Sequence, residues 1–95
     1  MPYFVIDFRD KPNAFEVRAA AREAHLAYIK DLGAQVKLGG PYVDEQGRMI
    51  GSLIIVEADS IEQVKALHDR DPYKQAGLFE TSTITEWRLS AQNFA

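Results

Sequence analysis

Residues 15 to 32 form the longest helical pattern in this 95-residue chain, and polar side chains interrupt its apolar side. At about 100° per residue, four apolar side chains fall within a sector of about 120°, which predicts a face packed against another layer. The same sector contains Arg18, Arg22 and His25, whose spacings of four and three residues make them neighbours along the helix. The four apolar side chains are those of Phe15, Leu26, Ile29 and Leu32.

A polar group that faces a protein core must be hydrogen-bonded or must open onto a cavity, because an unpaired buried charge costs much free energy. Arg18 lies in the first turn of the predicted helix, so its side chain is expected to reach solvent most easily. Arg22 and His25 lie deeper along the same face. These two residues therefore predict a cavity beside the helix.

Four short runs predict strands: three are rich in aromatic and β-branched residues, and one alternates apolar and polar residues. Residues 44 to 47 have the composition of a turn, so the second and third strands form a hairpin. Residues 9 to 13 are expected to be a loop, and residues 90 to 95 a tail. The predicted strands cover residues 3 to 8, 35 to 42, 49 to 57 and 80 to 89.

Several residues predict where the helices begin and end. Asn13 is the expected N-cap of the first helix, and Gly33 is expected to end it. Ser60 and Gln63 have the spacing of a capping box, which predicts the start of a second helix. That helix should stop before Pro72, because the residue before a proline disfavours helical backbone.

The resulting order, β-α-β-β-α-β, is that of the ferredoxin-like split βαβ arrangement, an α+β fold. Two helices are expected to cover one face of a four-stranded antiparallel sheet. The first strand carries Phe4, Ile6 and Phe8 on one side, but Tyr3 and Val5 on the other. Because both faces of the sheet are apolar and the chain has no third layer, we predict a homodimer, with further assembly left open.

Composition predicts a single globular domain over residues 1 to 95, with 46% hydrophobic and 26% charged residues. A net charge of −3 and scattered Lys and Arg residues argue against a nucleic-acid partner. The N-terminal sequence lacks the pattern of a signal peptide, and no apolar run approaches the roughly 20 residues that span a bilayer. Cysteine is absent, which fits a reducing compartment. A cytoplasmic protein without membrane contact is therefore expected.

His25 and Arg22 are the first candidates for a functional site. Histidine titrates near working pH, so His25 could act as a general acid or base, or it could be a half-buried imidazole bonded to backbone. Arg22 could hold an anionic substrate group in its planar fork, or it could form a structural salt bridge.

Other residues have more ordinary interpretations. Ser52 lacks the surroundings of a nucleophile, and His68 is expected to be structural. Asp71 could orient His25 or could simply end a helix, and Asp10 is expected to be a turn residue. The sequence has no metal-ligand spacing, phosphate loop or dinucleotide fingerprint, so neither a metal nor a cofactor is expected.

Short motifs along nearly the whole chain resemble the YCII-related (YciI-like) family. The motifs occur in the same order and spacing as in that family, on a chain with the same predicted order of elements. They are the opening strand at residues 3 to 8 with Asp10 after it, R-x-x-x-R-x-x-H-L at residues 18 to 26, Gly40-Pro41, Gly51-Ser52, and Asp71-Pro72-Tyr73 followed by Ala76-Gly77.

The resemblance implies a dimeric α/β-barrel built on the ferredoxin-like fold, with a pocket between helix and sheet. It also implies a catalytic pair formed by His25 and Asp71. The residues that it implies for substrate binding are Arg22, Ser52, Tyr73, Gly40 and Pro41.

Three functional hypotheses follow. The first is a lyase or isomerase that needs no cofactor and acts on a small aromatic or lactone substrate through His25 as acid and base. The second is a domain that binds a small ligand, or serves an accessory role, without catalysis. The third is a structural dimerisation module, in which the polar residues of the helix bond to protein groups and line no cavity.

Overall fold

The computed structural model describes residues 1–93 of the chain. The expected tail has no regular secondary structure over residues 90–93, and residues 94 and 95 lie outside the described residues. The elements follow the order that the sequence predicts, with one added short helix and one 3-10 turn. In chain order they are β1 (Tyr3–Asp10), α1 (Phe15–Leu32), η1 (Gly33–Gln35), β2 (Val36–Val43), β3 (Met49–Glu57), α2 (Ile61–Asp69), α3 (Pro72–Gln75) and β4 (Phe79–Trp87).

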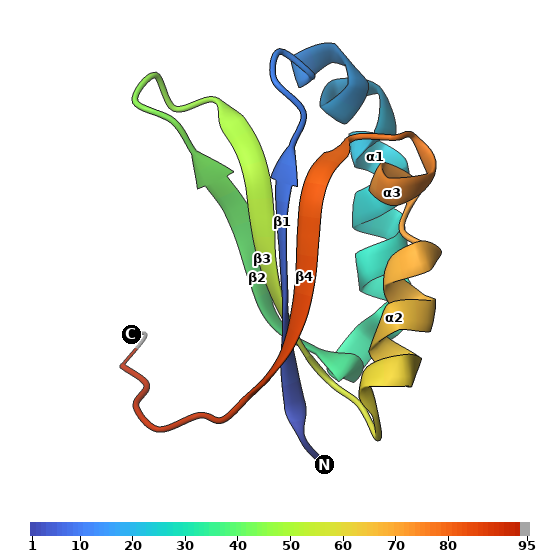
Figure 1. The fold of residues 1–95 in the computed structure, drawn as a ribbon, viewed down its shortest axis with the longest axis vertical. Helices are drawn as coiled ribbons and strands as arrows, with labels where there is room; N and C mark the ends of the chain where they lie inside the picture. Colours follow the sequence, from blue (N-terminus) through green and yellow to red (C-terminus); the bar gives the residue numbers. More distant parts are fainter. Residues whose placement is uncertain (94–95) are drawn as a thin grey trace.

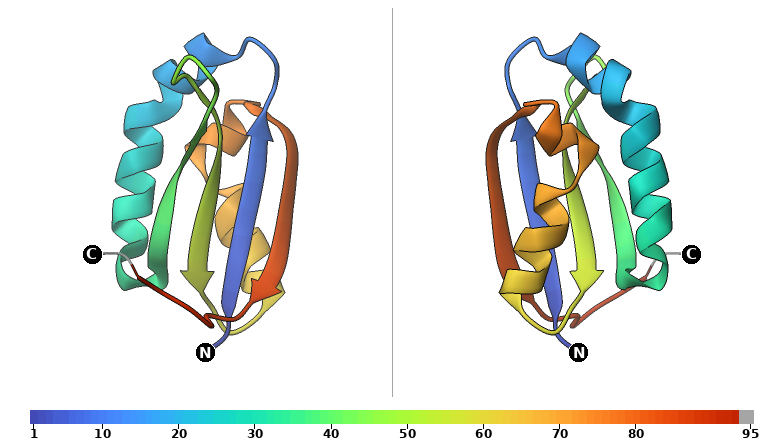
Figure 2. Two further views of the ribbon diagram at one scale, coloured as in Figure 1. Left: turned by 90° about the vertical axis from the view of Figure 1, so that its left-hand side faces the viewer. Right: turned by 90° about the vertical axis from the view of Figure 1, so that its right-hand side faces the viewer.

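The four strands form one antiparallel sheet in the order β2-β3-β1-β4. Figure 1 shows all the helices on one side of this sheet, as predicted. In Figure 2, α1 runs along the side of β2, whereas α2 and α3 lie behind β1 and β4. The ferredoxin-like arrangement predicted from the sequence is therefore confirmed.

The core lies between the sheet and the helices, and strand periodicity selects its residues. Phe4, Ile6 and Phe8 alternate along β1 and are almost fully buried, because successive side chains of a strand point to opposite faces. Register aligns Phe4 with Val56 and Ile6 with Ile54 of β3. Buried Val64, Leu67 and Tyr73 of the helices close this layer, together with Leu78 of the connection to β4.

The capping predictions are partly right. Ser60 precedes α2, and its Oγ accepts a hydrogen bond of 3.3 Å from the backbone N–H of Gln63. The Gln63 side chain reaches back to the backbone N–H of Asp59 rather than to that of Ser60. Asn13 is not the N-cap of α1: Ala14 holds that position without a side-chain hydrogen bond. Asn13 instead adopts a left-handed φ of 57°, which asparagine tolerates better than most residues.

The predicted first strand is too short. Arg9 and Asp10, expected in a loop, continue β1, which pairs with β4 as far as Asp10 and Phe79. Asp10 follows Phe8 by two residues, and its side chain lies on the same helix-covered side, only 6% exposed. It is therefore not a turn residue at the protein surface.

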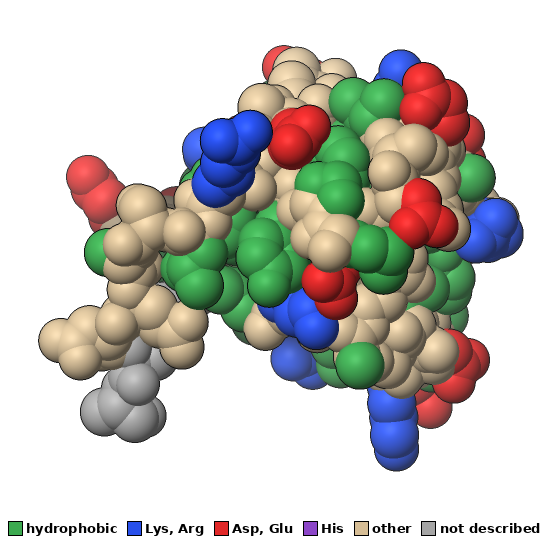
Figure 3. All heavy atoms as spheres, turned by 90° about the horizontal axis from the view of Figure 1, so that it is seen from below, with side chains coloured by type: hydrophobic (Ala, Val, Ile, Leu, Met, Phe, Trp, Pro, Cys, Tyr) green, Lys and Arg blue, Asp and Glu red, His purple; other side chains and the backbone are tan. Residues whose placement is uncertain are grey.

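Among residues 1–93, no helix covers the other face of the sheet. Its residues include Tyr3 and Val5, which register aligns with Trp87, Ile55 and their neighbours. The Tyr3 and Trp87 rings are 6.4 Å apart between centroids. Figure 3 shows hydrophobic atoms beside the C-terminal tail at the end of the molecule where both termini lie. No helix among residues 1–93 is both long enough and apolar enough to cross a membrane.

Candidate active site

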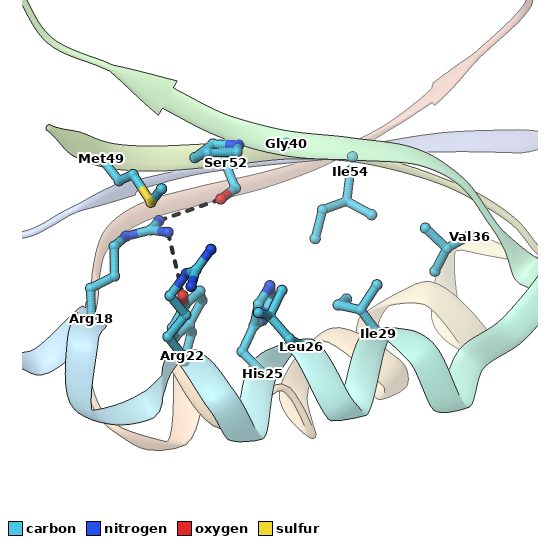
Figure 4. A pocket seen from close by; sticks show the side chains of 13 residues that line it. Arg18, Arg22, His25, Leu26, Ile29, Val36, Gly40, Met49, Ser52 and Ile54 are labelled. Carbon is cyan, nitrogen blue, oxygen red and sulfur yellow. Dashed lines mark hydrogen bonds between the residues drawn. The ribbon is translucent and has the colours of Figure 1, made fainter. Parts of the chain in front are cut away.

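A pocket of about 210 Å³ opens between α1 and the β2–β3 side of the sheet. Figure 4 shows Arg18, Arg22 and His25 projecting from α1 toward the strands, with Ser52 pointing back from β3. No acidic residue of the described chain lines this pocket. The residues that do are Arg18, Arg22, His25, Leu26, Ile29, Val36, Gly39, Gly40, Pro41, Met49, Ser52, Ile54 and Tyr73.

His25 and Asp71 form a buried pair at the side of the pocket. The distance from His25 Nδ1 to Asp71 Oδ1 is 2.8 Å, and the two side chains are 9% and 3% exposed. An ionised carboxylate can only accept, so Nδ1 carries the hydrogen and donates it. The other ring nitrogen, Nε2, has no hydrogen-bond partner within residues 1–93.

Local structure holds Asp71 in place. It is the N-cap of α3, and its Oδ1 accepts a 2.9 Å hydrogen bond from the backbone N–H of Tyr73. Pro72 at the first position of α3 suits the helix start, because its missing N–H needs no partner there. The D-P-Y motif thus builds a rigid turn that presents a carboxylate to α1.

Tyr73 fixes the imidazole from a second direction. Its ring stacks on that of His25 with 3.9 Å between centroids and 12° between planes. Tyr73 is only 1% exposed, and burial raises the pKa of its hydroxyl, although Arg18 and Arg22 nearby lower it. His25 is therefore held by a hydrogen bond at one edge and by an aromatic ring on one face.

Arg18 is buried, contrary to the expectation that it reaches solvent. It is 6% exposed, and its Nε donates to Asp10 Oδ2 at 2.7 Å. Its Nη2 shares its two hydrogens among Asp10 Oδ1 at 3.3 Å, Gly51 O at 3.0 Å and Ser52 Oγ at 3.3 Å. Extension of β1 to Asp10 is the physical reason, since it brings a carboxylate under the first turns of α1.

Arg22 is the more exposed of the two arginines, although the sequence predicts it deeper in the core. It lines the pocket and makes no hydrogen bond or ion pair within residues 1–93. A guanidinium without a carboxylate partner at the rim of an apolar pocket can bind an anionic oxygen.

The structure brings all the predicted site residues to one place. His25, Arg22, Ser52 and Tyr73 line the pocket, as do Gly40 and Pro41 of β2, while Asp71 lies behind His25 and contacts it. Their catalytic and binding roles stay predictions. Within residues 1–93, no group of three or more His, Cys, Asp or Glu side chains could hold a metal ion.

Sequence reasoning missed the polar support and much of the apolar lining. Asp10 could have been found from strand alternation, because it follows Phe8 by two residues. Leu26, Ile29 and Met49 have no such signal: an apolar side chain beside a cavity has the same sequence pattern as one in a packed core. Leu26 is nevertheless 49% exposed.

The second histidine, His68, is buried outside the pocket. Its ring stacks on Phe79 at 5.2 Å between centroids, and its Nε2 has no hydrogen-bond partner within residues 1–93. Burial lowers the pKa of His68 below the ordinary value of 6.5, and Lys74 lowers it further. Asp71 and Asp69 act in the opposite direction.

His68 is therefore expected to make the protein less stable in mild acid. The pKa is lower in the folded than in the unfolded chain, so protonation favours unfolding as the pH falls below about 6.5. Urea unfolding measured between pH 7.5 and 5 should show a steeper loss of stability for the native protein than for His68→Phe. Parallel pH profiles of the two proteins would contradict the assignment.

The fold and the pocket together define a class of small ferredoxin-like α+β proteins that hold a histidine–aspartate pair under the first helix. The YCII-related domain model matches residues 1–88, and the chain belongs to the YCII-related family. It is 33% identical to Protein YciI of Escherichia coli over 93 residues, covering 90% of this chain and 95% of that protein. An uncharacterized protein of Haemophilus influenzae is 34% identical over 85 residues, covering 81% and 87% of the two chains.

Two solved structures show the same fold. The 5-chloro-2-hydroxyhydroquinone dehydrochlorinase of Burkholderia phenoliruptrix, in complex with 2,5-dihydroxybenzoquinone, has a TM-score of 0.86 and 33% identity, covering 93% of this chain and 95% of that chain. Protein Atu4242 of Agrobacterium tumefaciens has a TM-score of 0.56 and 16% identity, covering 95% and 94%. The second similarity concerns the fold alone.

Proposed function

We propose that this chain is an enzyme of the lyase or isomerase type that moves a proton on a small substrate, with His25 as general acid and base. The observation that carries the proposal is the 2.8 Å pair of His25 and Asp71 beside an apolar pocket. A general base needs a fixed tautomer and a free nitrogen that faces the substrate. His25 has both, because Asp71 occupies Nδ1.

Side chains of the protein carry out the proposed proton transfer. Nε2 of His25 takes a proton from the substrate, and Asp71 stabilises the imidazolium that forms. In an isomerisation, the C–H electron pair moves toward a carbonyl oxygen, and Nε2 returns the proton to another carbon. In an elimination, that electron pair expels an anion from the neighbouring carbon, and the proton passes to water. Arg22 is placed to bind an anionic oxygen of the substrate in either case.

The shape and lining of the pocket support a small substrate with an apolar body. Aliphatic side chains of Leu26, Ile29 and Ile54 form much of its wall, and Arg22 supplies a cation. The dehydrochlorinase to which this chain is 33% identical acts on a hydroxylated chloroaromatic compound and binds a quinone. An aromatic substrate with ionisable hydroxyl groups is therefore the first class to test.

The test compares the native protein with His25→Gln on 5-chloro-2-hydroxyhydroquinone and a panel of hydroxylated aromatic and lactone compounds. Loss of the general base should lower kcat by about 10²- to 10⁴-fold. Circular dichroism should be unchanged, and 2,5-dihydroxybenzoquinone should still bind, because glutamine keeps a polar side chain at the site. Lys65→Gln, at an exposed position of α2, is the control and should keep full turnover.

Retention of turnover by His25→Gln would contradict the proposed role. Binding of the quinone without turnover of any compound by the native protein would favour the second hypothesis, a ligand-binding domain. The absence of acidic residues from the described pocket lining fits both, so only the kinetic comparison distinguishes catalysis from binding.

We further infer that two copies pack through their open sheet faces and that the protein acts in the cytoplasm. Leu38 is 41% exposed on that side, and it lies with Tyr3, Ile55 and Trp87 around one apolar hollow. Burying such a surface is favourable at about 25 cal/mol per Å² of apolar area. Light scattering at micromolar concentration should give twice the mass of one chain, and a single-chain mass would contradict the dimer.

A further inference from the structure

The hydroxyl groups of Ser52 and Tyr73 accept hydrogen bonds from one guanidinium and face the same pocket. We propose that these two hydroxyls donate together to a substrate oxygen that gains negative charge, and that Arg18 is the positioning residue that turns both toward it. The substrate class is then an enolisable carbonyl compound or a phenol. This inference rests on the proposed function, since the charge develops as His25 takes a proton.

The donors of Arg18 determine the direction of both hydrogen bonds. A guanidinium has only N–H donors and no acceptor, so each hydroxyl that contacts it must accept. Nη2 donates to Ser52 Oγ at 3.3 Å, and Nη1 donates to Tyr73 Oη at a long 3.5 Å. Within residues 1–93, neither hydroxyl donates its own hydrogen to a protein group. Both hydrogens are therefore available to a ligand.

The same contacts separate the roles of the two arginines. Asp10 neutralises Arg18 through two hydrogen bonds of 2.7 and 3.3 Å, and Gly51 O accepts from Nη2, the nitrogen that also contacts Ser52. Arg18 is thus committed to protein groups. Arg22 makes no ion pair within residues 1–93 and lies at the same end of the pocket in Figure 4. Arg22 supplies the charge, whereas Arg18 polarises and orients the neutral donors.

Burial keeps the donors preorganised. Ser52 is 5% exposed and Tyr73 is 1% exposed, so neither side chain has to surrender much water when a ligand enters. Burial also raises the pKa of Tyr73, which keeps its hydroxyl protonated as a donor at neutral pH. Fixed donors in a site of low dielectric stabilise a developing oxyanion more strongly than water does.

The test uses 4-nitrophenol, whose phenol and phenolate forms have different visible spectra. The native protein should bind the phenolate in preference to the phenol, so the bound probe should ionise at a lower pH than the free probe. Ser52→Ala and Tyr73→Phe should each weaken phenolate binding by about tenfold, the effect of one lost hydrogen bond to a charged group. Ser82→Ala and Tyr3→Phe, which make the same chemical changes away from the pocket, should bind within about twofold of the native protein.

Arg18→Lys tests the positioning role. Lysine keeps the charge but loses the planar fork, so the ionisation of bound 4-nitrophenol should return toward that of the free probe. If this variant fails to fold, the Ser52 and Tyr73 variants still decide whether the two hydroxyls donate to the bound phenolate. Native affinity for the phenolate in both Ser52→Ala and Tyr73→Phe would overturn the inference. An unchanged ionisation of 4-nitrophenol on binding to the native protein would overturn it as well.

The two proposals fail separately. Loss of phenolate binding in Ser52→Ala and Tyr73→Phe, with full turnover in His25→Gln, would keep the oxyanion site and remove the acid–base role. Loss of turnover in His25→Gln, with unchanged phenolate binding in the hydroxyl variants, would keep the acid–base role and overturn the oxyanion site.

Discussion

Replacing Asp71 with asparagine is expected to lower kcat by about 10²- to 10⁴-fold while leaving the fold intact. Asp71 Oδ1 accepts from His25 Nδ1 at 2.8 Å, and this contact makes Nε2 the basic nitrogen of the ring. Because this same oxygen also accepts from the Tyr73 backbone, asparagine keeps both contacts by placing its carbonyl oxygen there, but it brings no negative charge to stabilise the imidazolium. Proton transfer from the substrate to Nε2 would then lose the anionic partner that stabilises its product.

Asparagine keeps the second role of Asp71, which is to cap α3. Its carbonyl oxygen can still accept from the backbone N–H of Tyr73, and asparagine is as good an N-cap as aspartate. Asp69→Asn is the matched control, because Asp69 is exposed and pairs with Lys74. Steady-state kinetics should show a normal kcat for Asp69→Asn. A kcat within about threefold of the native value for Asp71→Asn would contradict the role given to the pair.

Replacing Asp10 with alanine is expected to destabilise the protein by about 3–5 kcal/mol. The change leaves the buried Arg18 guanidinium without its carboxylate, and an unpaired buried charge costs far more than the ion pair contributes. A domain of this size has a total stability of about 5–15 kcal/mol, so the midpoint of urea unfolding should fall steeply.

A double variant separates the charge from the packing. Asp10→Leu with Arg18→Met removes both charges and keeps apolar volume, so its loss of stability should be clearly smaller than that of Asp10→Ala. Lys37→Met is the control, because it breaks an exposed 3.3 Å pair with Glu57 that solvent screens. Equal stability of Asp10→Ala and the native protein would show that the Arg18 charge finds another partner.

The order of elements could be predicted because each depends on neighbours in sequence. Alternation of Phe4, Ile6 and Phe8 predicts β1, and the spacing of Ser60 and Gln63 predicts the start of α2. The strand-end prediction failed at Asp10, where β1 continues past the point at which its apolar alternation stops. Pairing with β4 holds the backbone extended there, and a pairing partner is not visible in a local pattern.

The candidate site, like the fold, could be predicted from the sequence only in part. His25 stands out in the sequence because imidazole on an apolar helix face needs a partner, and it has one in Asp71, 46 residues later. The sequence predicts the wrong depths for the two arginines, since Arg18 is buried and Arg22 is exposed. A helical wheel defines the angle between Arg18 and Arg22. It defines neither the rotation of the helix against the sheet nor the position of the Asp10 carboxylate that pairs with Arg18.

The sequence by itself determined which residues form strands and helices, and it marked one helix face as carrying polar groups. Hydrogen bonding and periodic burial act over a few residues, so their signals are local. Tertiary structure alone decided that Arg18 is enclosed with Asp10 and that Arg22 remains unpaired in the part of the chain that the structure describes. Burial and ion pairing depend on distances between segments far apart in the chain, and those distances exist only once the sheet and its helices have packed.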